Sequence, residues 1–123
     1  MEYLFEKIAE YFSPNKNNTT DIMDNNLTIK EGYGYKRGAI NTDWKKRLFV
    51  LNQKSLTYFK GGKSIPSGSI ELNTVQHISD IQKDNIFKLF TPGRVYEIRL
   101  DSQGDAVAWV EALNQASKRG PVA

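Results

Sequence analysis

The hydrophobic pattern of the chain changes twice, and each change marks an expected element boundary. In the first 13 residues apolar side chains recur at helical spacing among glutamates, which predicts an amphipathic helix over residues 1–13. Pro14 is expected to end it, because the residue before a proline disfavours the α conformation. The polar, asparagine-rich residues 14–26 then predict a linker. The apolar positions of the predicted helix are Tyr3, Leu4, Phe5, Ile8, Tyr11 and Phe12.

From residue 27 onward, apolar and polar residues alternate in short runs, which is the pattern of β-strands. Residues 52–54 and the Thr91-Pro92-Gly93 sequence have the composition of tight turns and predict hairpins. A glycine-rich loop is expected over residues 61–68. The predicted strands cover residues 27–36, 44–51, 55–60, 69–72, 86–90 and 94–100, with a further strand around Val75, Ile78 and Ile81.

Helical spacing returns near the end of the chain. Ser102, with Asp105 three residues later, predicts a capping box, and Gly120-Pro121 is expected to end the helix. Short strands followed by one helix predict a mainly β fold, a small barrel or sandwich, without room for βαβ units. The predicted domain covers residues 27–119. The expected apolar stripe of the helix is Ala106, Trp109, Val110, Leu113 and Ala116.

The net charge of +3 is unevenly distributed along the 123 residues. Residues 1–29 contain two basic and five acidic side chains, a net charge of −3. Residues 30–63 contain nine basic and two acidic side chains, a net charge of +7. Such a segment is either a solvated strand surface or a site for an anionic partner: a phosphoinositide headgroup, a nucleic acid or an acidic peptide.

Composition disfavours catalysis and metal binding. Cysteine is absent and His77 is the single histidine, so we expect no metal site, no cofactor and no catalytic residues. The apolar runs are too short to cross a bilayer, and the N-terminal stretch lacks the basic start of a signal peptide. We therefore expect a small cytoplasmic binding module that is not an enzyme.

The candidate site lies where two predicted strands meet. Eight residues separate Lys36 from Lys45, enough for a hairpin that brings Lys36, Lys45 and Arg47 together near its loop. Converging cations suit a polyphosphate, because arginine binds phosphate bidentately and lysine acts as a point charge. Residues 37–43 would add backbone amides and one further cation, Arg37.

The order of these segments resembles the pleckstrin homology family. The segments EGYGYKRG, TDWKKRLFVL, SLTYFK, GSIEL and DAVAWVEAL match the family pattern in order over residues 29–119, and the tryptophan of the family's C-terminal helix falls on Trp109. The resemblance implies a seven-stranded antiparallel barrel or sandwich closed by one C-terminal helix. The predicted N-terminal helix would be an addition to that fold.

The resemblance also implies a phosphoinositide site. Members that recognise 3-phosphorylated phosphatidylinositols carry a lysine in the first strand and a basic-x-Arg pair in the second, roles that fall on Lys36, Lys45 and Arg47. Tyr58 is implied to donate its hydroxyl to a phosphate, with a half-buried strand tyrosine as the alternative. Lys63 is the expected substitute for an arginine that some members place just before the fourth strand.

A domain of this kind has three conceivable uses. The first is reversible recruitment to membranes, the plasma membrane above all, with Ile40 at a loop tip as a candidate for insertion between lipids. The second is a protein-interaction module, in which the N-terminal helix packs on the domain, pairs with itself or binds another protein. The third, a nucleic-acid binder, is not expected, because the cations cluster for one compact headgroup instead of following a groove.

Overall fold

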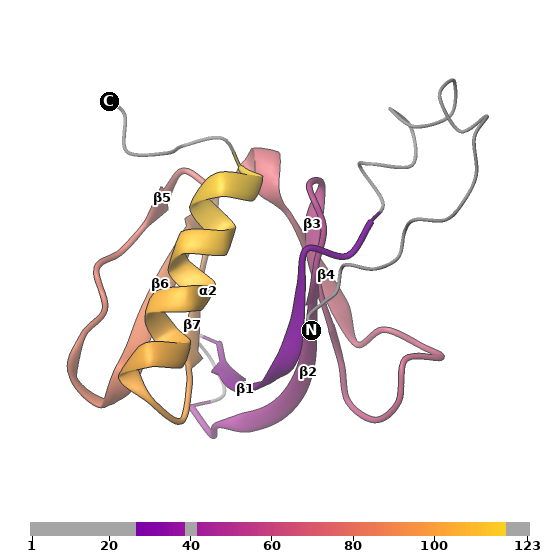
Figure 1. Ribbon diagram of the computed structural model, residues 1–123, viewed down its shortest axis with the longest axis horizontal. Coiled ribbons are helices and arrows are strands. Elements are labelled where there is room, and N and C mark those ends of the chain that lie inside the picture. The colour runs from indigo at the N-terminus through magenta and orange to yellow at the C-terminus, as the bar shows by residue number, and fades with distance from the viewer. Residues whose placement is uncertain (1–26, 39–41, 118–123) are drawn as a thin grey trace.

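The computed structural model describes residues 27–38 and 42–117. The predicted N-terminal helix (1–13), the linker (14–26) and Ile40 lie outside the described residues. Figure 1 shows the strands and the helix α2. The elements are β1 (Lys30–Arg37), β2 (Lys45–Leu51), β3 (Ser55–Phe59), β4 (Gly68–Glu71), β5 (His77–Ile78), β6 (Ile86–Thr91), β7 (Arg94–Arg99) and α2 (Gln103–Ala116), with single 3₁₀ turns at Leu72–Thr74 and Lys83–Asn85.

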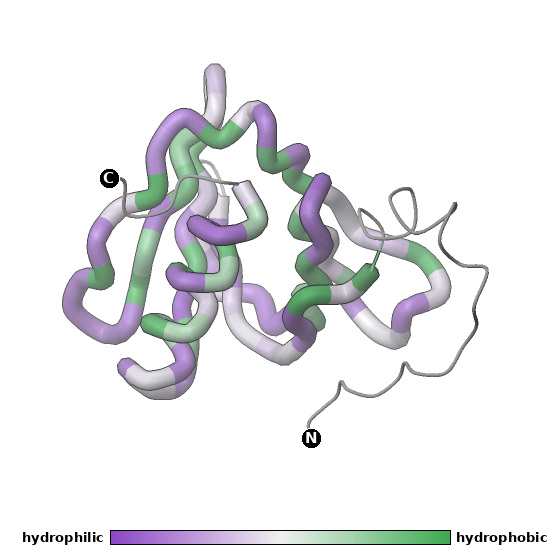
Figure 2. Tube along the Cα trace, turned by 45° about the horizontal axis from the view of Figure 1, so that its top comes forward, coloured by the Kyte–Doolittle hydropathy of each residue, from purple (hydrophilic) through white to green (hydrophobic). Residues whose placement is uncertain are grey.

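The strands form one antiparallel sheet in the order β4-β3-β2-β1-β7-β6-β5. Hydrophobic and hydrophilic positions alternate along the strands (Figure 2), and the main core cluster lies on the inner face of the sheet. The sheet bends so that its two halves face each other, and α2 lies along the opening between them (Figure 1). The prediction of a mainly β, seven-stranded fold closed by a C-terminal helix is confirmed.

The core lies between the bent sheet and α2. Trp109 of α2 is 6% exposed and meets Phe49 of β2 in an edge-on contact, with ring centroids 6.2 Å apart. Burial of such side chains stabilises the fold by about 1.5–3 kcal/mol each. The predicted helical stripe is confirmed in its main positions, since the residues of α2 that are buried are Ala106, Trp109, Leu113 and Ala116.

Both ends of α2 are set by serine side chains. Ser102 is the N-cap, and its hydroxyl accepts a hydrogen bond of 3.0 Å from the Asp105 amide, as predicted. The predicted C-terminal end was wrong, because the helix stops at Ala116 and not at Gly120-Pro121. The Ser117 hydroxyl donates a 2.7 Å hydrogen bond to the Leu113 carbonyl and so satisfies one of the last carbonyls of the helix.

The strand expected around residues 75–81 is reduced to the two residues of β5. The chain then leaves the sheet through the turn at Lys83–Asn85, where Asp84 and Asn85 adopt positive φ angles of 66° and 61°. Aspartate and asparagine tolerate this left-handed region better than most residues. The fourth strand also ends one residue early, because Leu72 begins a 3₁₀ turn.

Three connections gather at one end of the sheet. The β1–β2 loop follows Lys36, which pairs with Lys45, and the β3–β4 loop leaves β3 beside β2. The β6–β7 turn consists of Pro92 and Gly93, with Gly93 at a φ of 76°, a conformation that favours glycine. No helix within 27–38 and 42–117 is long and apolar enough to span a bilayer.

Candidate anion-binding site

The inner face of the β1–β2 hairpin, which points toward the core, carries three of the predicted site residues. Phe49 is 2% exposed and marks this face of β2, so strand alternation places Lys45 and Arg47 beside it. Lys36 of β1 is the direct cross-strand partner of Lys45. Directly paired residues lie about 4.5–5.5 Å apart, so the hairpin brings all three cations together, as the spacing predicted.

Lys36 lies at the rim of a small depression in the inner face. Its ammonium is 4.8 Å from the centre of the Tyr58 ring, a cation–π distance. Burial, and then the nearby charges of Arg94, Arg47 and Lys45, lower the pKa of Lys36 below that of an ordinary lysine. Each cause disfavours the charged ammonium. A bound anion would favour it, because its negative charge offsets the repulsion from the neighbouring cations. The depression is lined by Lys36, Phe49, Tyr58, Ile70, Tyr96 and Ile98.

Arg47 has an unusual hydrogen-bonding state. Its Nη1 donates a 2.8 Å hydrogen bond to the Lys46 carbonyl, which anchors one side of the guanidinium. Its Nε is shielded from solvent, and none of the described residues accepts a hydrogen bond from it. A buried donor without an acceptor is costly, by about 1–3 kcal/mol. This arrangement suits a guanidinium whose second partner is a ligand oxygen.

Tyr58 is part of the core, and its ring packs against the ammonium of Lys36. It is 7% exposed, and its ring lies 6.2 Å from that of Phe49. A Cβ atom at Gly68, its cross-strand partner, would come within 2.6 Å of Tyr58 Cζ, so this packing requires glycine there. Burial, followed by the neighbouring Tyr96, raises the pKa of Tyr58. The phenol therefore keeps its proton and can act as a donor.

Arg94 is a fourth cation that the sequence did not reveal. It begins β7 directly after the Pro-Gly turn, is exposed, and stacks on Tyr96 with its guanidinium carbon 4.3 Å from the ring centre. Its charge acts on both Lys36 and Tyr58. The pairing of β1 with β7 brings Arg94 close to Lys36. The one sequence signal was a basic residue directly after a hairpin turn.

Arg37 lies on the opposite, outer face of β1. Its Nε donates a 3.1 Å hydrogen bond to Glu97, and the same two side chains form an ion pair. The guanidinium carbon is also 4.4 Å from the centre of the Trp44 ring. The structure therefore does not bring Arg37 to the inner-face cluster, because strand alternation separates it from Lys36.

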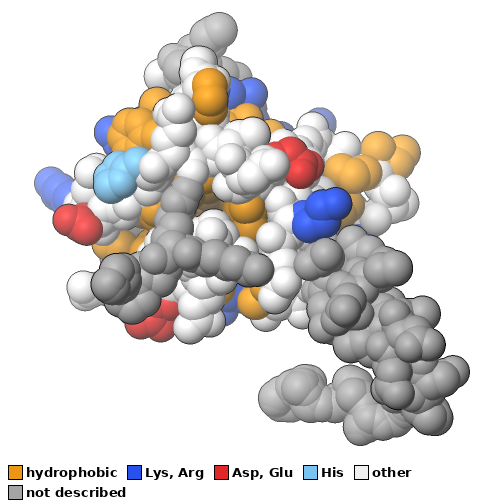
Figure 3. All heavy atoms as spheres, turned by 90° about the horizontal axis from the view of Figure 1, so that it is seen from above, with side chains coloured by type: hydrophobic (Ala, Val, Ile, Leu, Met, Phe, Trp, Pro, Cys, Tyr) orange, Lys and Arg blue, Asp and Glu red, His pale blue; other side chains and the backbone are white. Residues whose placement is uncertain are grey.

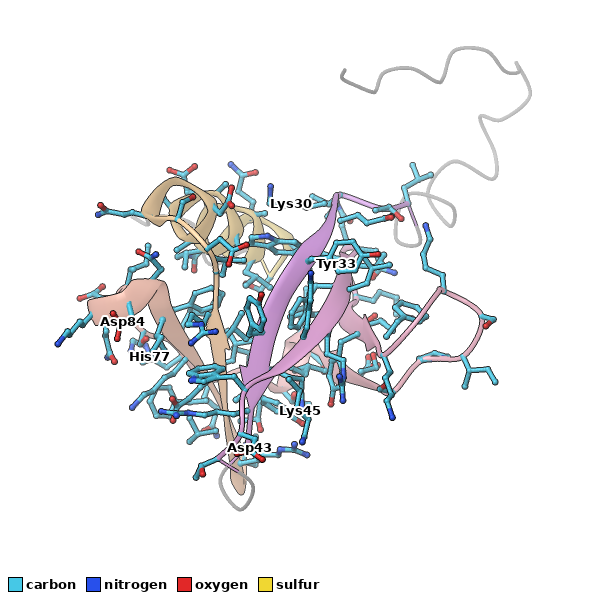
Figure 4. All side chains as sticks on the ribbon, turned by 90° about the horizontal axis from the view of Figure 1, so that it is seen from below. Lys30, Tyr33, Asp43, Lys45, His77 and Asp84 are labelled. Carbon is cyan, nitrogen blue, oxygen red and sulfur yellow. The ribbon has the colours of Figure 1, made fainter. Side chains whose placement is uncertain are left out.

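Lys63 is also separated from the cluster. Its ammonium forms a 3.1 Å ion pair with Glu31, in the β1 segment far from the β1–β2 loop. Glu31 and Lys36 are five positions apart along β1, about 17 Å at strand rise. Figure 4 shows the same separation along the hairpin, with Lys45 toward the loop end and Tyr33 toward the other.

Two other polar residues, Lys46 and His77, lie outside the cluster. Lys46 is on the outer face, with its ammonium 5.3 Å from the centre of the Tyr33 ring. His77 is exposed on β5, beside Phe90 (Figures 3 and 4). Among the residues that the structure describes, no three histidine or acidic side chains are grouped to hold a metal ion.

Comparison with protein families agrees with this architecture. The model of the PH domain family matches residues 28–118, most of the chain. The chain belongs to the PH domain family. PH domains are non-catalytic modules, and many larger proteins contain one.

Curated relatives share the PH domain and extend well beyond it. A RAC family serine/threonine-protein kinase homolog from Dictyostelium discoideum is 37% identical over 99 residues, which are 77% of this chain and 21% of that protein. Pleckstrin homology domain-containing family A member 2 from Mus musculus is 30% identical over 97 residues, 72% of this chain and 23% of that protein. The chain thus spans about a fifth of the length of these relatives.

Solved PH domains show the same arrangement of strands. The C-terminal PH domain of pleckstrin, in complex with D-myo-Ins(1,2,3,5,6)P5, superposes with a TM-score of 0.67 at 26% identity, over 74% of this chain and 96% of that one. The Slm1 PH domain, in complex with phosphoserine, has a TM-score of 0.65 at 20% identity, over 74% and 96% of the two chains. The second similarity supports the fold alone.

Proposed function

We propose that this PH domain binds phosphoinositide headgroups through Lys36, Lys45 and Arg47 and thereby recruits its protein to membranes. One observation carries the proposal. Three cations gather on the inner face of one hairpin, with Lys36 beside a small depression, and the ion pairs described above involve Arg37 and Lys63 instead. Like charges held this close favour an anionic partner, and the phosphates of a headgroup supply the counter-charge.

The individual side chains have different roles in this proposal. Arg47 offers the part of its guanidinium that the backbone does not hold to one phosphate, since Nη1 already donates to the Lys46 carbonyl. Lys36 stands over the Tyr58 ring and neutralises a second phosphate with Lys45. Tyr58 positions Lys36, and its hydroxyl is a donor at the bottom of the site. Arg94 approaches from the β6–β7 turn.

We further propose a preference for 3-phosphorylated phosphatidylinositols. The lysine of β1 and the basic-x-Arg pair of β2 support it, since both stand on the inner face. The inositol phosphate complex of the pleckstrin domain supports headgroup binding by this fold in general. Lys63 and Arg37, both in ion pairs, would contribute only to long-range attraction toward the anionic cytoplasmic leaflet. That attraction is about 1 kcal/mol for each free basic residue near the surface. The plasma membrane is the proposed destination.

Liposome binding at near-physiological salt tests the proposal. Vesicles containing mono-, bis- or tris-phosphorylated phosphatidylinositol are compared with phosphatidylserine vesicles of the same total charge. We expect binding to vesicles with a 3-phosphate to exceed binding to charge-matched phosphatidylserine by about tenfold or more. Binding that follows total charge alone would contradict a headgroup site and indicate a diffuse electrostatic surface.

A further inference from the structure

Apolar side chains are exposed around the start of β1. Leu27, Ile29 and Tyr33 are 54%, 43% and 63% exposed, and Ile65 in the β3–β4 loop is 78% exposed. In Figure 2 the described chain begins in green where this segment enters the sheet. Val107 on α2, at 38%, is the other large apolar side chain that is exposed in the described ranges. Four of these five residues thus belong to β1, the segment before it and one loop.

These residues lie on the outer side of the sheet. The Ile29 amide donates a 2.7 Å hydrogen bond to the Leu51 carbonyl and so extends the β1–β2 pairing, and alternation places Ile29, Glu31 and Tyr33 on one face. The ion pair between Glu31 and Lys63 holds the loop that contains Ile65 against this strand. We call Leu27, Ile29, Tyr33 and Ile65 the outer apolar patch.

An apolar row continues from this patch across the outer face. Tyr33 pairs with Leu48, and Leu48 pairs with Phe59 on β3. Leu48 and Phe59 are 7% and 8% exposed, yet neither belongs to the main core cluster on the inner face. Tyr33 therefore forms the exposed end of a second, outer layer of apolar side chains. Exposed apolar side chains that are grouped in this way are one signal of a docking site.

The N-terminal segment has the chemistry to cover the patch. Its apolar residues recur at helical spacing, and residues 1–13 contain three glutamates and one lysine, a net charge of −2. Lys46 stands beside Tyr33 on the outer face, so its positive charge would attract the glutamates of this segment. The 13 residues 14–26 join the segment directly to Leu27, the edge of the patch. A flexible linker of that length spans about 20 Å on average and gives an effective concentration in the millimolar range.

We infer that residues 1–13 dock as an amphipathic helix on the outer apolar patch of the same molecule. The patch and the cation cluster lie on opposite faces of β1. The docked helix therefore leaves the Lys36 side open and covers surface that would otherwise face solvent. This inference is independent of phosphoinositide binding.

Hydrogen exchange of the full chain, followed by mass spectrometry, tests the docking. We expect amides of residues 3–12 to exchange about tenfold or more slowly than in a variant carrying Ile29→Asp and Tyr33→Asp. Ile8→Asp, on the other side of the contact, should remove the same protection and cannot disturb the sheet itself. Val107→Asp is the matched control, because it places the same charge at an exposed apolar position on α2, and it should leave the protection unchanged.

Three results would overturn the inference. The first is exchange of residues 3–12 at the rate of an unstructured chain in the unmodified protein. The second is protection that survives Ile29→Asp and Tyr33→Asp, since the helix would then dock elsewhere. The third is protection that rises with protein concentration, together with a dimer mass in sedimentation, which would assign the patch to a second copy of the chain.

Discussion

The two faces of the β1–β2 hairpin differ in how the positive charges on them are partnered. On the outer face, Arg37 is paired with Glu97 and stacked on Trp44. On the inner face, Lys36 and Arg47 have no acidic ion-pair partner among the described residues, and Lys36 is partly desolvated. The outer cations contribute to the structure of the sheet. The inner cations are left available for a ligand.

In the proposed site, strand alternation, more than charge, determines which basic residues face the headgroup. Lys36 and Arg37 are adjacent in sequence and are indistinguishable in a count of basic residues. They differ because successive side chains point to opposite faces of a sheet. The positive charge of the whole segment therefore predicts attraction to anions. The side chains on its inner face indicate where we expect a phosphate group to bind.

The largest expected effect on headgroup affinity is that of Lys36→Ala, with Arg37→Ala as its comparison. Removing Lys36 should weaken binding of a soluble inositol phosphate headgroup about 30-fold or more, equivalent to about 2 kcal/mol, because a charged group in contact with phosphate is lost. Removing Arg37 should change the affinity by less than about threefold. Isothermal titration calorimetry measures both. Equal losses would show that the faces do not differ.

Arg94→Ala should have an intermediate effect. The arginine acts on Lys36 across the site but is exposed, so its loss should weaken headgroup affinity by about five- to tenfold. Lys88→Ala is the matched control, since it removes one positive charge from the neighbouring strand β6, beside Glu97 on the outer face. The same calorimetric titration compares the two variants, and a larger loss for Lys88→Ala would exclude Arg94 from the site.

Arg37→Ala should affect stability more than binding. The substitution removes the ion pair with Glu97 and the stacking on Trp44, both partly exposed, so the free energy of unfolding should fall by about 0.5–1 kcal/mol. Thermal unfolding followed by circular dichroism should show a decrease of a few degrees. Lys36→Ala should show no such decrease, because it relieves repulsion between cations.

The smallest effect is a pH dependence at alkaline pH. The pKa of Lys36 is lowered in the free domain, and a bound phosphate favours the charged ammonium, so binding is coupled to proton uptake by Lys36. Phosphate is fully ionised above about pH 8, so in that range affinity should fall as the pH rises and Lys36 loses its proton. The fall should begin at a lower pH than deprotonation of an ordinary lysine would give. Lys36→Arg should remove this dependence, and an unchanged profile in that variant would assign the titration to another group.

Local patterns predicted much of this structure. The spacing of the first two predicted strands correctly brought Lys36 beside Lys45, and the serine cap of α2 lies at the expected residue. These features depend on period, turn chemistry and capping, which a few neighbouring residues determine.

Features that depend on the pairing of distant strands could not be predicted from the sequence. Arg94 joins Lys36 only because β7 pairs with β1, strands almost 60 residues apart. Lys63 was expected near the phosphates, yet a glutamate on the outer face of β1 holds it at a distance. The strand expected around residues 75–81 is shortened to His77–Ile78, and directly after it the Ser79 hydroxyl accepts a hydrogen bond from the Lys88 amide. No local pattern encodes such partners.

The most direct test of the central claim compares Arg47→Ala with Lys46→Ala. The two residues are neighbours on β2, carry the same charge and lie on opposite faces of the sheet. In calorimetric titrations with a soluble inositol phosphate headgroup, Arg47→Ala should lose about 30-fold in affinity and Lys46→Ala less than about threefold. Both variants should retain the circular dichroism spectrum of the unmodified domain. Equal losses, or a larger loss for Lys46→Ala, would contradict an inner-face site.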